Sequence, residues 1–151
     1  MPLGRQADQQ IGANLEGFVI PSAAVPAATY HVKSNQDGTY SLAAGAPTLK
    51  DALYSAGKYL DVVLDITVPN GGTVTISIFG IDPASGKVFP TAGILVSAAL
   101  GAAATTRLEV GPALTAAANL VVNDFIPLYF GIQVVVATAT VTFSLGGSQM
   151  P

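Results

Sequence analysis

The residues that could do chemistry in this sequence are few and lie far apart. His31 is the only histidine, and neither of the spacings HxH and HExxH, which would bring a second histidine to a metal, can occur. A Ser-His-Asp triad is formally available, but no GxSxG turn is present to expose a serine. The absence of cysteine removes thiolate chemistry and disulfides. We therefore interpret His31 as a packed or surface residue of a strand.

Two carboxylates recur at a spacing that places them side by side. Asp61 and Asp65 lie in the alternating segment YLDVVLDITV, so both project from one face of a strand. Paired carboxylates can act as general acid and base. The segment, however, brings no apolar pocket or aromatic sugar platform with them. We interpret both as solvated charges on a strand face.

Two polar loops resemble ligand-binding sequences without completing them. Asn35 and Asp37 could begin a cation-binding loop, but too few oxygen ligands follow, and Asp37-Gly38 is a strong turn signal. The loop DPASGK, residues 82–87, lacks the earlier glycine and the following Ser or Thr of a phosphate-binding loop. We therefore predict that the protein is not an enzyme, and that it takes no cofactor, metal or small-molecule substrate.

The composition argues for a surface that is partly covered by other subunits. The chain has 151 residues, about the length of one domain. Half of them are hydrophobic and only 10% are charged, against about 25% in an ordinary soluble domain. The six basic residues are scattered singly, so we expect no nucleic-acid binding. The most apolar window, residues 93–104, is shorter than the roughly 20 residues of a membrane-spanning helix. No signal peptide is evident, so we expect a protein made in a cytoplasm that has no membrane contact.

Alternating residues and regular turn signals predict the fold class. Short apolar/polar segments are separated every 8 to 12 residues by turns such as NQDG, PNGG and DPASGK. This pattern is typical of an all-β fold, an antiparallel β-sandwich or jelly-roll-like barrel of about eight or nine strands. We expect it to occupy residues 29–151.

Residues 1–28 are expected to form an extended N-terminal arm outside the sandwich. Pro21 and Pro26 favour extended backbone, and the stretch is too polar and too Ala-rich to build a core. It could be a disordered tail, or an arm that becomes ordered on a neighbouring subunit. Leu15, Phe18 and Ile20 are the candidate partner-binding residues of such an arm.

The connector GPALTAAANLVVNDFIP, residues 111–127, is unusual between strand-like segments. One interpretation is a one-turn helix that covers an open end of the sandwich and blunts an edge strand. The other is a contact between subunits. Asn119 and Asn123 can cap turns with their side chains, and we take them as further candidate contact residues.

The same connector carries a resemblance to a known family. DPASGK, a short strand pair, the segment Pro112–Pro127 and a closing VTFSLG follow in the order seen in a family of small proteins encoded in tailed-bacteriophage structural-gene regions. The resemblance covers roughly residues 58–147. The chain departs from the family at Ala113, where a glycine is usual, and at residues 128–130, where Leu-Tyr-Phe replaces Arg-Thr-Trp.

The resemblance implies a virion structural role, most plausibly as a head decoration or cement protein. Its expected partners are the major capsid protein and copies of itself, as a homotrimer. Its expected place is the outer capsid surface, after synthesis in the host bacterial cytoplasm. Two alternatives stay open. A tail or baseplate component would usually need a long stacking hairpin, and a carbohydrate-binding adhesion module would need a cluster of exposed aromatic rings.

Overall fold

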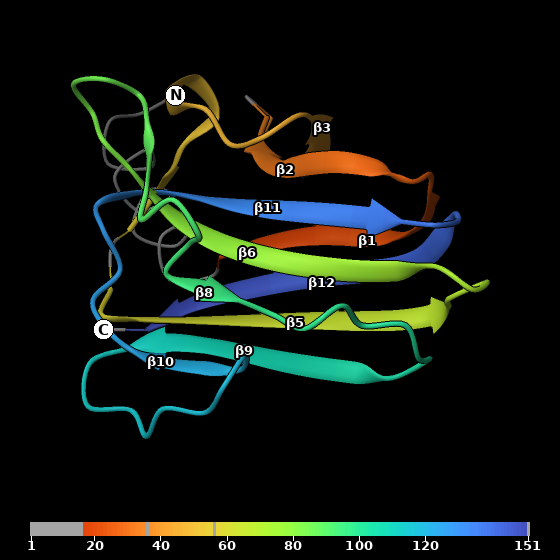
Figure 1. The fold of residues 1–151 in the computed structure, drawn as a ribbon. Helices are drawn as coiled ribbons and strands as arrows, with labels where there is room; N and C mark the ends of the chain where they lie inside the picture. The colour runs from red at the N-terminus through yellow and green to blue at the C-terminus, as the bar shows by residue number, and fades with distance from the viewer. Residues whose placement is uncertain (1–16, 36, 56, 151) are drawn as a thin grey trace.

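Two β-sheets packed face to face form the molecule (Figure 1). The computed structural model describes residues 17–35, 37–55 and 57–150. In these ranges the only helical element is the 3-10 turn η1 (Leu49–Asp51). The strands are β1 (Phe18–Val25), β2 (Ala28–Ser34), β3 (Tyr40–Ala44), β4 (Leu53–Tyr54), β5 (Tyr59–Val68), β6 (Thr73–Ile81), β7 (Val88–Phe89), β8 (Leu95–Val96), β9 (Thr105–Gly111), β10 (Val121–Asn123), β11 (Tyr129–Ala137) and β12 (Val141–Met150).

The strand pairing is antiparallel with one exception. Sheet I has the order β1-β12-β5-β9-β10, and sheet II has the order β3-β2-β11-β6-β7, with β4 beside β11 and β8 beside β6. Only β9 and β10 pair in parallel. The predicted all-β sandwich is confirmed. Eight of the strands in the described residues have five or more residues, and the other four have two or three.

The connectivity is that of a jelly roll with further strands at the edges of both sheets. If β1, β2, β5, β6, β8, β9, β11 and β12 are renumbered 1 to 8, sheet I reads 1-8-3-6 and sheet II reads 2-7-4-5. This order is that of the double-sheet jelly roll. The strand β10 extends sheet I beyond β9. The strand β3 extends sheet II beyond β2, through the hairpin that Asp37-Gly38 predicted.

The core lies between the two sheets, where alternate residues of each long strand point inward. In β5 the alternation is strict: Leu60, Val62, Leu64 and Ile66 are buried, and the residues between them are not. The same period supplies the inner face of the other central strands. These buried residues are Val74, Ile76 and Ile78 of β6, Phe130, Ile132, Val134 and Val136 of β11, and Val141, Phe143 and Leu145 of β12.

A second, smaller apolar cluster lies on the outer face of sheet II. Phe79 and Ile81 alternate with the inward residues of β6, yet both are buried. Residues 45–52 cover this face, because Gly131 has no side chain and Pro47 packs directly over it, beside Ile81. The loop that begins at Gly93 lies close to Phe79. Both faces of β6 are therefore covered.

The expected arm is partly a strand of the sandwich. Residues 18–25 form β1 and pair with β12 from Phe18 opposite Gly147 to Val25 opposite Val141. Phe18 and Ile20 are 5% and 6% exposed, so they pack in the sandwich core and not on a separate arm, and their contact with a partner stays a prediction. Gly147 has no side chain, so the Phe18 ring can lie directly against the backbone of β12. Pro21 sits on this edge strand where the pairing register shifts.

The connector holds a strand where a helical turn was one interpretation. Residues 121–123 form β10, which pairs in parallel with residues 109–111 of β9. Val121 and Val122 are β-branched and favour this pairing. A tight turn closed by a hydrogen bond from Val121 N to Ala117 O precedes β10. The helix prediction was therefore wrong, but the edge strand β9 is covered, as that interpretation required.

The burial of Phe18 gives a direct test of β1. We expect Phe18→Ala to lower the free energy of unfolding by about 3–5 kcal/mol, because the ring fills a site between Gly147 and Tyr40. Val19→Ala is the matched control, since Val19 is 67% exposed and its loss should cost less than about 0.5 kcal/mol. Urea denaturation of the three proteins measures both. Equal stabilities for the two variants would contradict the placement of β1.

Candidate functional site

Exposed hydrophobic side chains gather at one end of the sandwich. Nine large hydrophobic residues are exposed in the described part of the chain, and five of them lie at the end where β5 and β11 begin and β6 and β12 end, on the left in Figure 1. Three are prominently exposed: Phe125 at 67%, Leu128 at 61% and Tyr54 at 59%. We call this surface the apolar end, and define it by Tyr54, Phe89, Phe125, Leu128 and Met150.

Sheet II supplies the first half of the apolar end. Tyr54 of β4 lies opposite Tyr129 of β11, and their rings meet edge to face with centroids 5.1 Å apart. Ser55 N donates a hydrogen bond of 2.8 Å to Leu128 O, which fixes Leu128 beside this pair. Phe89 and Pro127 both pack over Gly80, so β7 joins the same surface.

Sheet I supplies the other half. Met150 ends β12 opposite Tyr59, and the Tyr59 ring packs on Gly111 at the end of β9. Asp124 N donates to Gly111 O at 3.1 Å, which brings the following residue, Phe125, to this end. The apolar end therefore spans both sheets.

The opposite end of the sandwich lacks such a group of exposed hydrophobic residues among the described residues. The turns there are made of residues 69–72, 101–104 and 138–140, which are mainly Gly, Ala, Thr and Asn. Of the described large hydrophobic residues that are exposed, Val68 alone lies there. Because single exposed hydrophobic residues are common and clusters are not, we take the apolar end as the candidate interaction surface.

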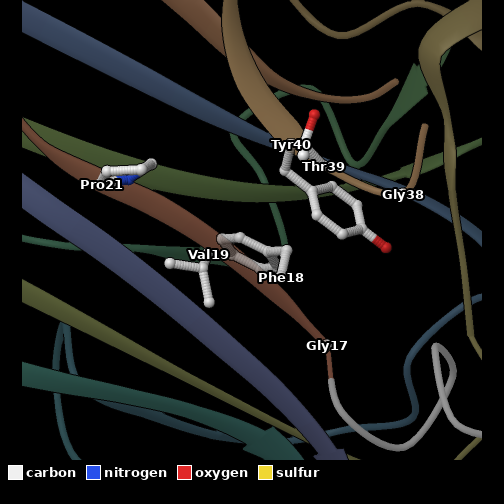
Figure 2. Close-up of a pocket in the computed structure, with 7 residues that line it drawn as sticks. All are labelled: Gly17, Phe18, Val19, Pro21, Gly38, Thr39 and Tyr40. Carbon is white, nitrogen blue, oxygen red and sulfur yellow. The ribbon is translucent and has the colours of Figure 1, made fainter. Parts of the chain in front are cut away.

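A shallow pocket of about 380 Å³ adjoins the apolar end (Figure 2). It lies between the start of β1 and the β2–β3 turn, and the tilted rings of Phe18 and Tyr40, 6.0 Å apart, form its apolar part. Its lining is otherwise Gly17, Val19, Pro21, Gly38 and Thr39, without a charged side chain. Such a lining suits an apolar side chain better than a charged ligand.

The rim of this pocket carries one carboxylate. Asp37 accepts hydrogen bonds from Thr39 Oγ1 at 2.6 Å and from Thr39 N at 3.0 Å. The hydroxyl bond is the larger cause of the lowered pKa of Asp37, and the backbone bond adds to it. Asp37 therefore serves the β2–β3 turn, as the sequence predicted.

His31 is a packed residue, in agreement with the sequence interpretation. Its side chain is 4% exposed, and both ring nitrogens have partners. Nδ1 lies 3.0 Å from Gly45 O and Nε2 lies 2.8 Å from Asp51 Oδ2. These contacts bind η1 and the Gly45 turn to the outer face of β2. Neither nitrogen is left to bind a metal or a substrate.

Asp61 and Asp65 lie on the outer face of sheet I, as expected, but each has a partner. Arg107 Nε donates to Asp61 Oδ1 at 2.9 Å, and Thr105 Oγ1 donates to Asp65 Oδ1 at 3.1 Å. The hydrogen bond to Asp61 raises the pKa of Arg107, and the charges of Asp61 and Glu109 add to the effect. No group of three or more His, Cys, Asp or Glu that could hold a metal occurs among the described residues.

The loop 82–87 is a turn closed by its own side chains. Asp82 accepts from Ser85 Oγ at 2.7 Å and from Ala84 N at 3.0 Å. The bond from Ser85 is the main cause of the lowered pKa of Asp82. The polar groups of Asp82, Ala84 and Ser85 therefore bond one another within the loop, as in an ordinary turn.

Of the predicted contact residues, two are exposed and tie the connector to the body. Asn119 Nδ2 donates to Val96 O at 3.0 Å, and Asn123 Oδ1 accepts from Ala113 N at 2.8 Å. Both bonds join residues ten or more positions apart, so they anchor the connector instead of capping local turns as the sequence reasoning expected. Leu15 lies outside the described residues. The sequence reasoning missed Phe125 and Leu128, although two large apolar residues flanking Pro127 in a polar, small-residue connector were a signal.

Comparison of the chain with models of protein families, with curated proteins and with solved structures found no match. In the described residues there is no helix that is both long enough and apolar enough to cross a membrane.

The His31 contacts predict a stability effect on the outer face of sheet II. We expect His31→Ala to lower the free energy of unfolding by about 1–3 kcal/mol, because the substitution removes the ring that contacts Gly45 O and the Asp51 carboxylate. Lys33→Ala, on the same strand, is the control and should change it by less than about 0.5 kcal/mol. Urea denaturation at neutral pH is the measurement, and an equal loss in both variants would contradict the assignment.

The Asp82 turn predicts a titration. Because the folded carboxylate has a lowered pKa, its stabilising bonds are complete above the ordinary carboxyl pKa and are lost as the pH falls through the lowered value. We expect Ser85→Ala to move the pKa of Asp82 up toward its ordinary range. NMR titration of the side-chain carboxyl carbon measures this, with Ser144→Ala on the outer face of sheet I as the control. An unchanged midpoint in Ser85→Ala would show that Ser85 is not the cause.

Proposed function

We propose that this chain is a non-enzymatic virion structural protein of a tailed bacteriophage, a head decoration protein that binds the assembled shell. The apolar end is the observation that carries the proposal. Five large hydrophobic residues from both sheets and the connector are exposed there together, while His31, Asp61 and Asp82 are engaged in local contacts elsewhere.

The energetics of such a surface favour a protein partner. Burying one Phe or Leu side chain contributes about 1.5–3 kcal/mol, so two or three such anchors can supply much of a stable interface. A protein that binds only the assembled shell stabilises that shell by mass action. No bond needs to be made or broken for this function.

The fold and the sequence resemblance support the same proposal. Double-sheet jelly rolls occur in viral capsid domains and in lectins, although a fold alone does not set a function. The resemblance to small proteins of phage structural-gene regions points to the first of these. On this proposal the partners are the major capsid protein and copies of the chain itself, as a homotrimer on the outer capsid surface.

Carbohydrate binding is the second candidate, and one observation favours it. The sequence contains no Trp, yet Tyr54, Phe89 and Phe125 are all exposed at the apolar end. An exposed ring such as that of Tyr54 can stack on a sugar face. Carbohydrate binding ranks lower because the sequence resemblance supports a virion structural role instead.

A binding experiment on phage heads tests the proposal. Heads of the phage that encodes this chain, made with its gene deleted, are mixed with purified protein, and bound copies are counted by quantitative gel and electron microscopy. We expect saturation at regular lattice positions. The double variant Phe125→Ser/Leu128→Ser should bind at least about tenfold more weakly, because it removes two exposed anchors.

Val68→Ser is the matched control, because Val68 is an exposed hydrophobic residue of the opposite end. It should bind as the unmodified protein does. Failure to bind at lattice positions would refute the decoration role, and saturable binding to host surface polysaccharide instead would establish the lectin alternative. Equal weakening by the Val68 variant would show that the apolar end is not the contact.

A further inference from the structure

We propose that the open edge of β3 binds an extended segment of another protein, which adds to sheet II as a further strand. The segment is uncharged where it meets β3, and it places one apolar side chain in the pocket between Phe18 and Tyr40. This surface is separate from the residues that define the apolar end, and the inference does not rest on the proposed function.

Backbone hydrogen bonds at both ends of β3 fix the phase of its pairing with β2. Gly45 N donates to Thr29 O at 2.8 Å just after the strand, and Asn35 N donates to Thr39 O at 2.8 Å just before it. In an antiparallel pair, residues that bond the partner strand alternate with residues that do not. The register between the two strands runs without a shift, so both bonds belong to one alternation.

This alternation shows which backbone groups of β3 face away from β2. Ser41 and Ala43 are in phase with the two bonds, so their N–H and C=O groups face β2, and those of Tyr40, Leu42 and Ala44 face the other way. Within the described ranges, β2 is the only strand beside β3. A row of outward N–H and C=O groups is matched by the backbone of another extended chain.

The other sheet edges in the described ranges carry features that hinder strand addition, and β3 does not. Pro21 and a register shift interrupt β1, and β10 has three residues. The far edge of sheet II is formed by β7 and β8, which have two residues each. Short strands, proline and bulges are common means of blocking edge pairing. In contrast, β3 has five residues, with neither proline nor a charged side chain.

Apolar side chains lie beside the open edge. Tyr40 and Leu42 pack against the core but are only partly buried. The Tyr40 ring lies 6.0 Å from the ring of Phe18 on β1, and the pocket of about 380 Å³ is formed at these two rings (Figure 2). A strand added to β3 brings every second side chain to this side, so one of them can enter the pocket. Backbone bonds then provide attachment, and the pocket provides selectivity.

Charge and size favour a partner segment over a second copy. Residues 38–49 include no charged residue and the pocket lining includes none, so an uncharged segment matches this surface. Five residues at about 3.4 Å make an edge about 17 Å long, and a sheet is about 10 Å thick. Two paired β3 edges therefore bury on the order of 350 Å², far below the roughly 1,200 Å² of a stable interface. A segment that continues into the pocket buries more than the edge alone.

A peptide selection followed by hydrogen exchange tests the proposal. A random ten-residue library displayed on yeast is selected with the full chain, and each enriched sequence is synthesised and added to ¹⁵N-labelled chain. In the free chain we expect the amides of Tyr40, Leu42 and Ala44 to exchange faster than those of Ser41 and Ala43. The bound peptide should slow exchange at the first three by at least about tenfold, because their N–H groups gain partners.

A proline substitution tests the edge itself. Ala44→Pro removes one outward N–H and no bond to β2, since proline is tolerated where an edge N–H faces solvent. We expect the Kd of the selected peptides to rise at least about tenfold. Ala44→Ser is the matched control, because it keeps the N–H and should bind as the unmodified chain does. On the peptide side, changing each apolar residue to Ser in turn should weaken binding most at one position.

Three results would overturn the proposal. The first is a selection that yields no peptide able to slow exchange at the outward amides. The second is equal affinity of the selected peptides for Ala44→Pro and for the unmodified chain, with the exchange pattern of the unmodified chain unchanged by the peptide. The third is slow exchange of the outward amides in the free chain. If that slow exchange strengthens with chain concentration, a second copy occupies the edge.

Discussion

The apolar layer between β5 and β12 on one side and β6 and β11 on the other is the interaction on which the rest of the molecule depends. These four strands have nine or ten residues each, and nearly every second side chain is buried between the sheets. A one-residue slip in any of them would turn its hydrophobic set outward, so the layer fixes the register of both sheets. The register in turn places Tyr129, Met150, Gly80 and Tyr59 at a common end, where the exposed hydrophobic residues gather.

Much of the fold follows from the sequence because alternation is a strong signal. The segment 59–68 alternates without a break, and the turn signals at Asp37-Gly38 and in residues 82–87 fall where the structure turns. Contacts between residues far apart in the sequence were not predictable in this way. Residues 18–25 resemble an arm in the sequence because Pro21, Ser22 and two alanines interrupt the alternating pattern. The absence of a side chain at Gly147, more than a hundred residues away, makes room for Phe18. The parallel pairing of β10 likewise depends on β9 and leaves no local trace.

The candidate site was less predictable than the fold. Each residue with evident chemistry, such as His31 or Asp82, is engaged in holding local structure. The apolar end instead consists of residues that are individually ordinary and are brought together by strand ends from β4, β7, β11 and β12 and by the connector. Sequence reasoning searched for side chains that react. What distinguishes this molecule is a set of exposed hydrophobic side chains that come together only in the tertiary structure.

The sandwich is polar in the sense that exposed hydrophobic residues lie at one end and turns of small residues at the other. A copy seated by its apolar end has one orientation, and the turns at residues 69–72, 101–104 and 138–140 then face outward. Those turns are built from small residues, and they connect strands whose pairing is fixed by the core beneath them. A foreign sequence inserted in the 101–104 turn would face away from the surface bound through the apolar end in every copy. The same asymmetry that marks a binding surface therefore makes the opposite end a natural platform for display.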